Sequence, residues 1–152
     1  MKNTVNSFAQ ELKRTNTRVV FQLASNIPLA GIEAIELEEV ATCILENSLQ
    51  GMPTGGKITI ATAFKKDEQA VSVEIKDEGV GIPRENISRV FEPFFTTKQA
   101  RADQSAGLGL SIVYSIIKEC KGEVTIKSSL GHGTQVKITL PIFKNHNHHK
   151  RN

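Results

Sequence analysis

The sequence predicts an α+β fold, a two-layer sandwich in which helices cover one face of a β-sheet. Segments of alternating hydrophobicity and segments of helical periodicity occur in the order strand, helix, two strands, long irregular segment, helix, two strands. The length of 152 residues matches one domain with one core. Hydrophobic residues make up 39% and charged residues 23%, which is sufficient for a packed interior and too little charge for a disordered chain.

The first elements lie in the N-terminal third. Residues 1–16 are polar, with Phe8 and Leu12 at helical spacing, and are expected to form a linker or the end of a preceding helix. Residues 18–24 (RVVFQLA) have the composition of a strand. A long amphipathic helix that ends near Gly51 follows, because small and hydrophobic residues recur at a spacing of 3.6: Ile35, Val40, Ala41, Ile44, Leu45, Ser48, Leu49 and Met52.

The remaining regular elements surround a long irregular segment. Residues 57–64 and 70–77 are predicted to form an antiparallel hairpin around a polar connection. Residues 110–120 have helical periodicity, and 124–129 and 134–141 alternate as strands do. Between the two halves, hydrophobic periodicity is lost from Glu78 to Gly107. A structureless stretch of that length inside a compact domain is usually functional. The polar residues 144–152 are expected to be disordered, so the domain is predicted to span 17–143.

Charge and cysteine content exclude several classes. The net charge is +3, but Lys144, Lys150 and Arg151 lie in the last nine residues, and without them 16 basic and 16 acidic residues remain. A neutral body argues against nucleic acid as a partner. Cys43 and Cys120 have no paired spacing, so we expect neither a disulfide nor a zinc site, and a cytoplasmic location. No segment is apolar enough to span or contact a membrane, although a longer parent protein with an anchor stays open.

Asp77 is the first candidate site residue. On the strand VSVEIKD, it continues the core-facing row of Val71, Val73 and Ile75. A buried carboxylate needs donor partners, and the exocyclic amine of a nucleobase is one such donor. The simpler interpretation, a turn-forming Asp at the end of a strand, stays open.

Two pairs of glycines follow. Gly79 and Gly81 allow a tight turn and the close approach of a flat ligand, or merely a turn. Gly107 and Gly109 begin the second helix, where free backbone N–H groups favour an anion such as phosphate. The alternative is that this second pair only permits close helix packing. On the first helix, the amide oxygen of Asn47 is suited to Mg²⁺, unless Asn47 is simply a solvated polar residue.

Five segments carry a family resemblance in their order and spacing: ENSLQGMPTGGKITI, DEGVGIP, FEPFFTTK, GLGLSIV and GHGTQVKITLP. They resemble the N box, the first glycine box, the F box and the second and third glycine boxes of the catalytic ATP-binding domain of bacterial sensor histidine kinases, which are ATPases of the GHKL type. The resemblance covers about residues 17–143. The wording of FEPFFTTK and of QGM..GGKI is most similar to the nitrogen-regulation type. A mixed sheet and a flexible ATP lid at about residues 96–106 are implied.

The resemblance also implies residue roles. Asp77 accepts from the adenine amine, with Thr134 supporting the base through water, and Asn47 binds Mg²⁺. Lys98 reaches the phosphates, and Asn47 and Lys98 together serve catalysis. The remaining nucleotide-binding positions are Gly79, Gly81, Ile82, Gly107, Leu108, Gly109 and Leu110. Three phenylalanines are expected either to anchor the lid and face the partner helix or to pack in the core: Phe91, Phe94 and Phe95.

Two positions depart from the family pattern. Members usually carry a second Asn one turn before Asn47, where this chain has Cys43. A neutral thiol is a poor Mg²⁺ ligand, so phosphate binding is weakened, or Glu39 or Glu46 compensates. The first glycine of the second glycine box is replaced by Ser105, which is suited to cap the following helix. A non-catalytic nucleotide-binding or docking module is therefore an alternative.

The histidines define the expected reaction. Only His132, His146, His148 and His149 are present, in a turn and in the polar tail, and none has the helical context of a phosphoacceptor. The expected function is therefore to bind Mg-ATP and donate the γ-phosphate to a histidine on a separate dimerisation domain, with a response regulator downstream. The chain is expected to be an excised domain or a standalone protein acting in trans. An anti-sigma-type serine kinase of the same superfamily is a further alternative.

Overall fold

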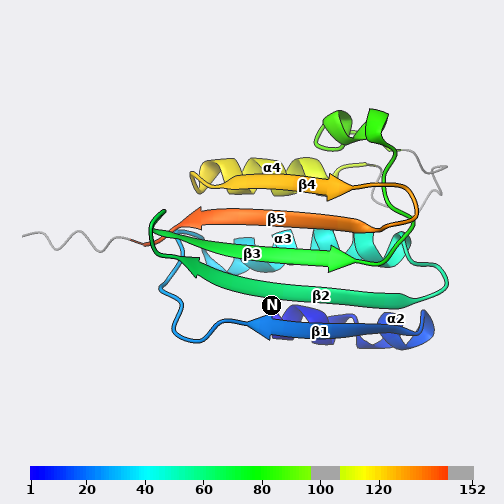
Figure 1. Ribbon diagram of the computed structural model, residues 1–152, viewed down its shortest axis with the longest axis horizontal. Helices are drawn as coiled ribbons and strands as arrows, with labels where there is room; N and C mark the ends of the chain where they lie inside the picture. Colours follow the sequence, from blue (N-terminus) through cyan, green and yellow to red (C-terminus); the bar gives the residue numbers. More distant parts are fainter. Residues whose placement is uncertain (97–106, 144–152) are drawn as a thin grey trace, which may run out of the picture.

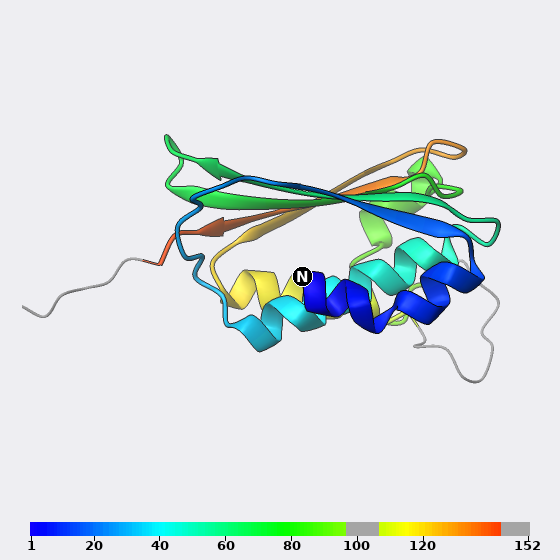
Figure 2. The same cartoon turned by 90° about the horizontal axis from the view of Figure 1, so that it is seen from below.

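A computed structural model describes residues 1–96 and 107–143. Its centre is a five-stranded sheet in the order β1-β2-β3-β5-β4. The strands are β1 (Thr17–Leu23), β2 (Gly56–Lys65), β3 (Ala70–Asp77), β4 (Glu123–Ser128) and β5 (Thr134–Pro141). The helices lie together on one face of this sheet, as Figures 1 and 2 show. The predicted α+β two-layer sandwich is confirmed.

The sheet is mixed. β1 and β2 run parallel, joined through the long helix α3 (Ala34–Gln50), whereas all the other neighbours are antiparallel. β2 and β3 form the predicted hairpin, in a register that places Ile58 opposite Asp77. β5 lies between β3 and β4, so the end of β3, the end of β4 and the start of β5 meet at one end of the sheet (Figure 1).

The core lies between the sheet and two helices. α3 begins with a capping box. The side chain of Glu33 accepts from the backbone N–H of Glu36, and the side chain of Glu36 accepts from the backbone N–H of Glu33. α4 (Gly109–Glu119) packs beside α3. The buried rows predicted from periodicity form one cluster, whose fully buried members include Val40, Ile44, Leu45, Ile58, Ile60, Ile75, Val113, Ile117, Ile138 and Leu140.

The first sixteen residues contribute to this core. They form two short helices, α1 (Lys2–Ser7) and α2 (Ala9–Arg14). Val5 is buried, and Met1, Phe8 and Leu12 pack partly buried against the core cluster. The domain boundary at residue 17 remains a prediction.

The expectation of an entirely irregular segment from residue 78 to 107 is wrong in one place. A 3₁₀-helix, η1 (Arg84–Arg89), follows directly after Pro83, which lies at its N-cap. Hydrophobic periodicity cannot reveal such an element, because a 3₁₀-helix of this length is too short to show a repeat. The predicted lid at 96–106 and the tail at 144–152 lie, apart from Thr96, outside the described residues.

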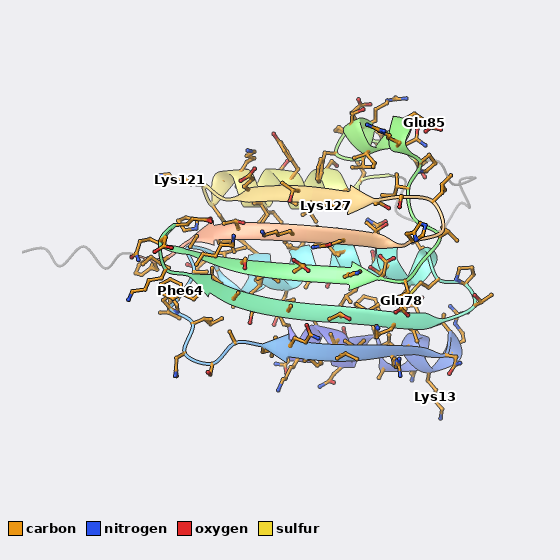
Figure 3. The ribbon with its side chains drawn as sticks, viewed as in Figure 1. Lys13, Phe64, Glu78, Glu85, Lys121 and Lys127 are labelled. Carbon is orange, nitrogen blue, oxygen red and sulfur yellow. The ribbon has the colours of Figure 1, made fainter. Side chains whose placement is uncertain are left out.

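The second face of the sheet is left uncovered by the described helices. Figure 3 shows its side chains, among them Lys127 of β4 and Glu78 just beyond β3. Polar and small residues occupy most of this face, with Val20 of β1 as an exposed hydrophobic exception, because the alternation of each strand sends most of its hydrophobic residues to the helices. Among the described helices, none is long and apolar enough to cross a membrane.

Candidate nucleotide-binding site

Asp77 is the centre of the candidate site. Only 7% of its surface is exposed, as expected from its place in the core-facing row of β3. Its Oδ1 accepts hydrogen bonds from the backbone N–H of Gly79 at 2.9 Å and of Thr134 at 3.1 Å. Its Oδ2 accepts from the hydroxyl of Ser48 at 3.0 Å. The carboxylate therefore holds together the first glycine turn, the start of β5 and the helix α3.

The glycines of the turns permit close backbone packing around Asp77. Gly81 has φ +73°, and a methyl group there would collide with the carbonyl oxygen of Ser129. Gly133 has φ +75°, and a methyl group there would collide with the carbonyl oxygen of Asp77. A methyl group at Gly79 would lie only 2.7 Å from the carbonyl oxygen of Gly51. The absence of a side chain is thus a steric requirement at all three positions.

Ser128 joins the turns on the other side. Its hydroxyl accepts from the N–H of Ile82 at 2.8 Å and donates to the carbonyl of Gly133 at 2.7 Å. It also shares a hydrogen bond of 2.9 Å with the hydroxyl of Thr134. Neither Ser128 nor Ser48 was among the site residues expected from the sequence. A core-facing position at the end of β4 was the available signal for Ser128, and its place in the apolar helical row was the signal for Ser48.

The second part of the site lies where α3 passes the start of α4. A methyl group at Gly109 would lie 3.8 Å from the amide nitrogen of Asn47 and 3.7 Å from Cβ of Cys43. The structure therefore brings the predicted metal residue next to the predicted phosphate-binding turn of Gly107, Leu108, Gly109 and Leu110. The first backbone N–H groups of any helix lack partners within it, and among the described residues no side chain caps α4.

Cys43 stays a neutral thiol at physiological pH. Burial raises the pKa of the Cys43 thiol, and the negative charges of Glu46 and Glu39 raise it further. Among the described residues, no group of three His, Cys, Asp or Glu is placed to hold a metal ion. The site residues fit Mg²⁺ only in the form common for nucleotide enzymes, with one protein oxygen, here from Asn47, and the phosphates as the other ligands.

The three phenylalanines of the F box lie in different surroundings. Phe91 packs partly buried against the core and meets Tyr114 of α4 with ring centroids 5.4 Å apart. Phe94 is 72% exposed, has φ +63°, and donates its N–H to the carbonyl of Gly107 at 3.1 Å. The ring of Phe95 lies 4.4 Å from the guanidinium of Arg89. Core packing thus applies to Phe91, while Phe94 faces solvent.

The described residues bring together Asn47, Asp77, Gly79, Gly81, Ile82, Gly107, Gly109 and Thr134 at one end of the sheet and of the α3 and α4 pair. Lys98 and Ser105 lie outside the described residues. The individual roles assigned to all of these residues remain predictions.

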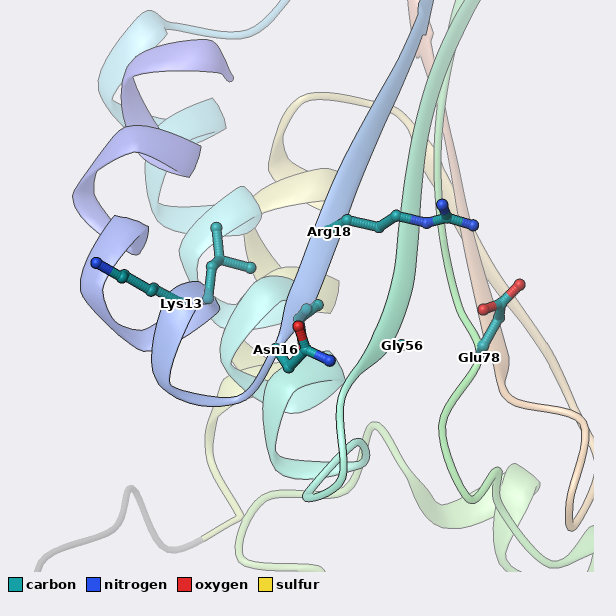
Figure 4. A pocket seen from close by; sticks show the side chains of 7 residues that line it. Lys13, Asn16, Arg18, Gly56 and Glu78 are labelled. Carbon is teal, nitrogen blue, oxygen red and sulfur yellow. The ribbon is translucent and has the colours of Figure 1, made fainter.

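A separate hollow of about 490 Å³ lies between α2 and the start of β1 (Figure 4). It is lined by Leu12, Lys13, Asn16, Thr17, Arg18, Gly56 and Glu78, none of which is a predicted site residue. The pKa of Glu78 is lowered, chiefly because Lys57 donates a hydrogen bond of 2.9 Å to it. Arg18 extends toward Glu78 on the side of the sheet away from the helices.

Comparison with known proteins agrees with this geometry. Sporulation kinase E of Bacillus subtilis is 35% identical over 145 residues, which cover 95% of this chain and 19% of that protein. Sensor kinase CckA of Brucella abortus is 40% identical over 119 residues, 70% of this chain and 12% of that protein. The chain thus spans about a fifth or less of the length of these two relatives.

Solved structures show the same fold. The catalytic domain of histidine kinase ThkA superposes with a TM-score of 0.77 at 24% identity and covers 93% of this chain and 89% of that one. Full-length ShkA in complex with AMPPNP has a TM-score of 0.78 at 20% identity, over 93% of this chain and 29% of that one. The family model of the histidine kinase-, DNA gyrase B- and HSP90-like ATPases matches residues 32–144. The chain belongs to this ATPase family.

Proposed function

We propose that this domain binds ATP together with Mg²⁺ and donates the γ-phosphate to a histidine on a separate dimerisation and phosphoacceptor domain. The observation that carries the proposal is the buried Asp77 carboxylate, which is linked through Ser48 to the helix that carries Asn47. A base-binding acceptor and a metal-binding amide are thereby held on one rigid unit. The relatives that are named sporulation and sensor kinases support the reaction class.

Different residues contact the base and the phosphates. Asp77 accepts from the exocyclic amine of adenine, and Gly79, Gly81 and Ile82 let the base approach the backbone. Thr134 supports the base through water. Such a pocket positions the nucleotide, and phosphoryl transfer depends mainly on positioning and neutralisation of charge.

The phosphates extend toward the start of α4. Backbone N–H groups of Gly107, Leu108, Gly109 and Leu110 bind phosphate oxygens, and Lys98 adds a positive charge. Mg²⁺, when bound at the amide oxygen of Asn47, neutralises negative charge on the phosphates. The attacking Nε2 of the acceptor histidine forms the new N–P bond as the bond between the γ-phosphorus and the bridging oxygen of ADP breaks.

The partners follow from the reaction. A phosphoacceptor histidine comes from the same parent chain or in trans, and a response regulator receives the phosphoryl group afterwards. We place the domain in the cytoplasm, which is consistent with the free thiols of Cys43 and Cys120. Membership of the nitrogen-regulation type rests on the wording of two segments, FEPFFTTK and QGM..GGKI, since the relatives compared carry sporulation and other sensor names.

One observation favours a second function, a non-catalytic nucleotide-binding or docking module. Cys43 presents a neutral thiol where a second amide is expected, so the phosphates lose one polar contact. The third alternative, an anti-sigma-type serine kinase, is less consistent with the FFTTK segment and with the residues after Gly107.

The decisive experiment incubates the chain with γ-labelled ATP and Mg²⁺, with and without purified dimerisation-helix domains. Label on an acceptor histidine, lost in Asn47→Ala and in Asp77→Ala, supports the kinase. ATP binding without transfer to any acceptor supports the non-catalytic module. Nucleotide affinity that is unchanged in both variants contradicts the site itself.

A further inference from the structure

Ser128 is an unassigned residue beside the proposed base pocket. It is the last residue of β4 and lies directly opposite Thr134 in the register of β4 and β5. Three groups surround its hydroxyl within hydrogen-bond distance: the N–H of Ile82 at 2.8 Å, the carbonyl of Gly133 at 2.7 Å and the hydroxyl of Thr134 at 2.9 Å. The hydroxyl therefore uses its whole hydrogen-bonding capacity.

The chemistry of these partners decides the direction of each bond. A serine hydroxyl has one proton to donate and two lone pairs to accept with. The carbonyl of Gly133 can only accept, so it takes the proton of Ser128. The N–H of Ile82 can only donate, so it occupies one lone pair. The second lone pair must face Thr134, and the Thr134 hydroxyl is consequently the donor in the bond that joins the two side chains.

Thr134 is thus left with lone pairs only. Its side chain shares the helix-facing side of β5 with the buried Val136 and Ile138, which is also the side of β3 on which Asp77 lies. The carboxylate of Asp77 is likewise placed as an acceptor, since three donors already point at it. At this corner, both side chains that face the proposed base can accept hydrogen bonds, and neither has a proton to offer.

We infer that Ser128 is a positioning residue that fixes the Thr134 hydroxyl as an acceptor, and thereby makes the pocket select a purine with a 6-amino group over one with a 6-oxo group. The inference rests on the proposed nucleotide site and concerns its specificity. Adenine offers an amine donor to this corner, which the Thr134 hydroxyl can accept. A 6-oxo purine offers an acceptor at the same position, where no donor side chain meets it.

Removal of Ser128 reverses this restriction. In Ser128→Ala, the Thr134 hydroxyl no longer has to donate to residue 128, so it can rotate and donate to a 6-oxo group. The substitution should therefore change the affinity for one base relative to the other. A loss of pocket shape, in contrast, would weaken both bases together.

The test compares ADP with IDP, which differ only in the base, by titration calorimetry of the full chain with Mg²⁺. We expect the wild-type chain to bind ADP more tightly. In Ser128→Ala, the ADP-to-IDP affinity ratio should fall about fivefold, the value of one ordinary hydrogen bond. Ser129→Ala is the matched control, because that neighbouring side chain is exposed and makes no hydrogen bond within the described part of the chain. Its ratio should equal that of the wild type.

Thr134→Val keeps the inference falsifiable if Ser128→Ala does not fold, and a double variant tests the coupling of the two residues if it does. Thr134→Val removes the acceptor itself and should also lower the ratio. The double variant Ser128→Ala/Thr134→Val should have the same ratio as Thr134→Val alone, because Ser128 acts only through Thr134. Equal weakening of ADP and IDP in Ser128→Ala or Thr134→Val overturns the inference while leaving the nucleotide site intact. A wild-type chain that binds neither nucleotide overturns the proposed function, and the inference with it.

Discussion

At the scale of single residues, the position of Asp77 explains why a carboxylate is tolerated in the core. Three donors meet its two oxygens, so the group is compensated even though 93% of its surface is removed from solvent. Two of these donors are backbone N–H groups, from Gly79 and Thr134, whose places are set by the turn and by the start of β5. The side chain is therefore rigid before any ligand arrives, which is the property that a recognition group requires.

Asp77→Asn should separate recognition from folding. The amide oxygen can keep the bonds from Gly79 and Thr134, and Ser48 can turn to accept from the new NH₂ group. The chain is expected to fold, with ATP affinity reduced about 100-fold because an acceptor for the adenine amine becomes a donor. Circular dichroism and calorimetry check both points. Glu74→Gln, on the uncovered face of the same strand, is the control and should leave affinity unchanged.

Gly81 and Gly131 form a matched pair for the turns. Both have positive φ, +73° and +78°, so an alanine at either strains the backbone by about 1 kcal/mol. Only at Gly81 would the new methyl group collide with a neighbour, the carbonyl of Ser129, whereas Gly131 has nothing within 4 Å. Gly81→Ala should therefore abolish nucleotide binding and lower the melting temperature further than Gly131→Ala. Similar behaviour of the two variants in thermal melts and titrations would contradict the steric account.

The sequence predicted some of these residues and missed others for a physical reason. The period of two along VSVEIKD placed Asp77 on the core side of the strand. A charged residue that interrupts an otherwise apolar row is noticeable in the sequence. Ser48 occupies the same kind of position in α3, but a small hydroxyl is common in helix cores, so this position alone did not distinguish it as a site residue. The hydrogen-bond partner of Ser48 is Asp77, which lies 29 residues away in the sequence, so only the packed structure identifies the bond.

At the scale of elements, α3 is the component that joins the two halves of the site. Its buried face packs on the sheet, and its last turns carry Cys43, Asn47 and Ser48 past the start of α4. An approach of 3.7 Å between Cβ of Cys43 and a methyl group built at Gly109 places residue 43 beside the proposed phosphates. The nature of residue 43 should therefore be measurable through metal-dependent binding.

Cys43→Asn should tighten Mg²⁺-dependent ATP binding. The thiol is kept protonated by burial and by Glu46 and Glu39, which raise its pKa, so it is a poor ligand for a hard cation. An amide oxygen at the same place should improve affinity about tenfold in the presence of Mg²⁺ and leave it unchanged in EDTA. Cys120→Ser is the control, because this substitution changes a thiol that lies away from the site residues. No gain in the Asn variant would mean that another residue already supplies the contact.

The elements were predictable to within a residue or two, whereas their arrangement was not. β3 was expected at 70–77 and lies there, and β5 was expected at 134–141 and lies there. Local periodicity cannot specify that β1 joins β2 in parallel or that β5 lies between β3 and β4, because both are choices of long-range pairing. The 3₁₀-helix Arg84–Arg89 escaped detection because it lacks a repeat.

At the scale of the whole molecule, the two thiols link stability to pH. Burial raises the pKa of Cys43 and of Cys120, and nearby glutamates raise both further. A raised pKa means that the folded chain keeps these protons more tightly than the unfolded chain does. The stabilisation is complete below the ordinary thiol pKa of 9.0 and is lost as pH rises through the higher folded values.

The free energy of unfolding should therefore fall above pH 9 more steeply in the wild type than in Cys43→Ala/Cys120→Ala. The comparison between the two proteins removes the contributions of lysine and tyrosine, which titrate in the same range and are common to both. Urea unfolding at pH 7, 9 and 10 measures the difference. Parallel pH profiles would show that the thiols titrate alike in the folded and unfolded chains.

The N-terminal helices raise the question of where the structural domain begins. The sequence predicted that residues 1–16, which are mostly polar, form a linker or the end of a preceding helix. In the fold, however, α1 lies against α3, and Val5 is 7% exposed within the core cluster. Met1, Phe8 and Leu12 extend the same apolar contact. A segment that covers core in this way should contribute to the stability of the ATPase domain.

Val5→Ala should then destabilise the chain by about 2 kcal/mol, or about 5 °C in melting temperature, since it removes two buried methyl groups from a packed site. Asn6→Ala is the matched control: it lies in the same helix, one residue along, and is exposed, so its melting temperature should stay within about 1 °C of the wild type. Nucleotide affinity should be equal in both variants, because neither residue lies in the site. If Val5→Ala melts like the control, α1 is only loosely attached and the structural domain begins at β1, as the sequence predicted. If it melts lower, truncated chains that begin at residue 17 should be unstable, and kinase assays on them would underestimate the activity.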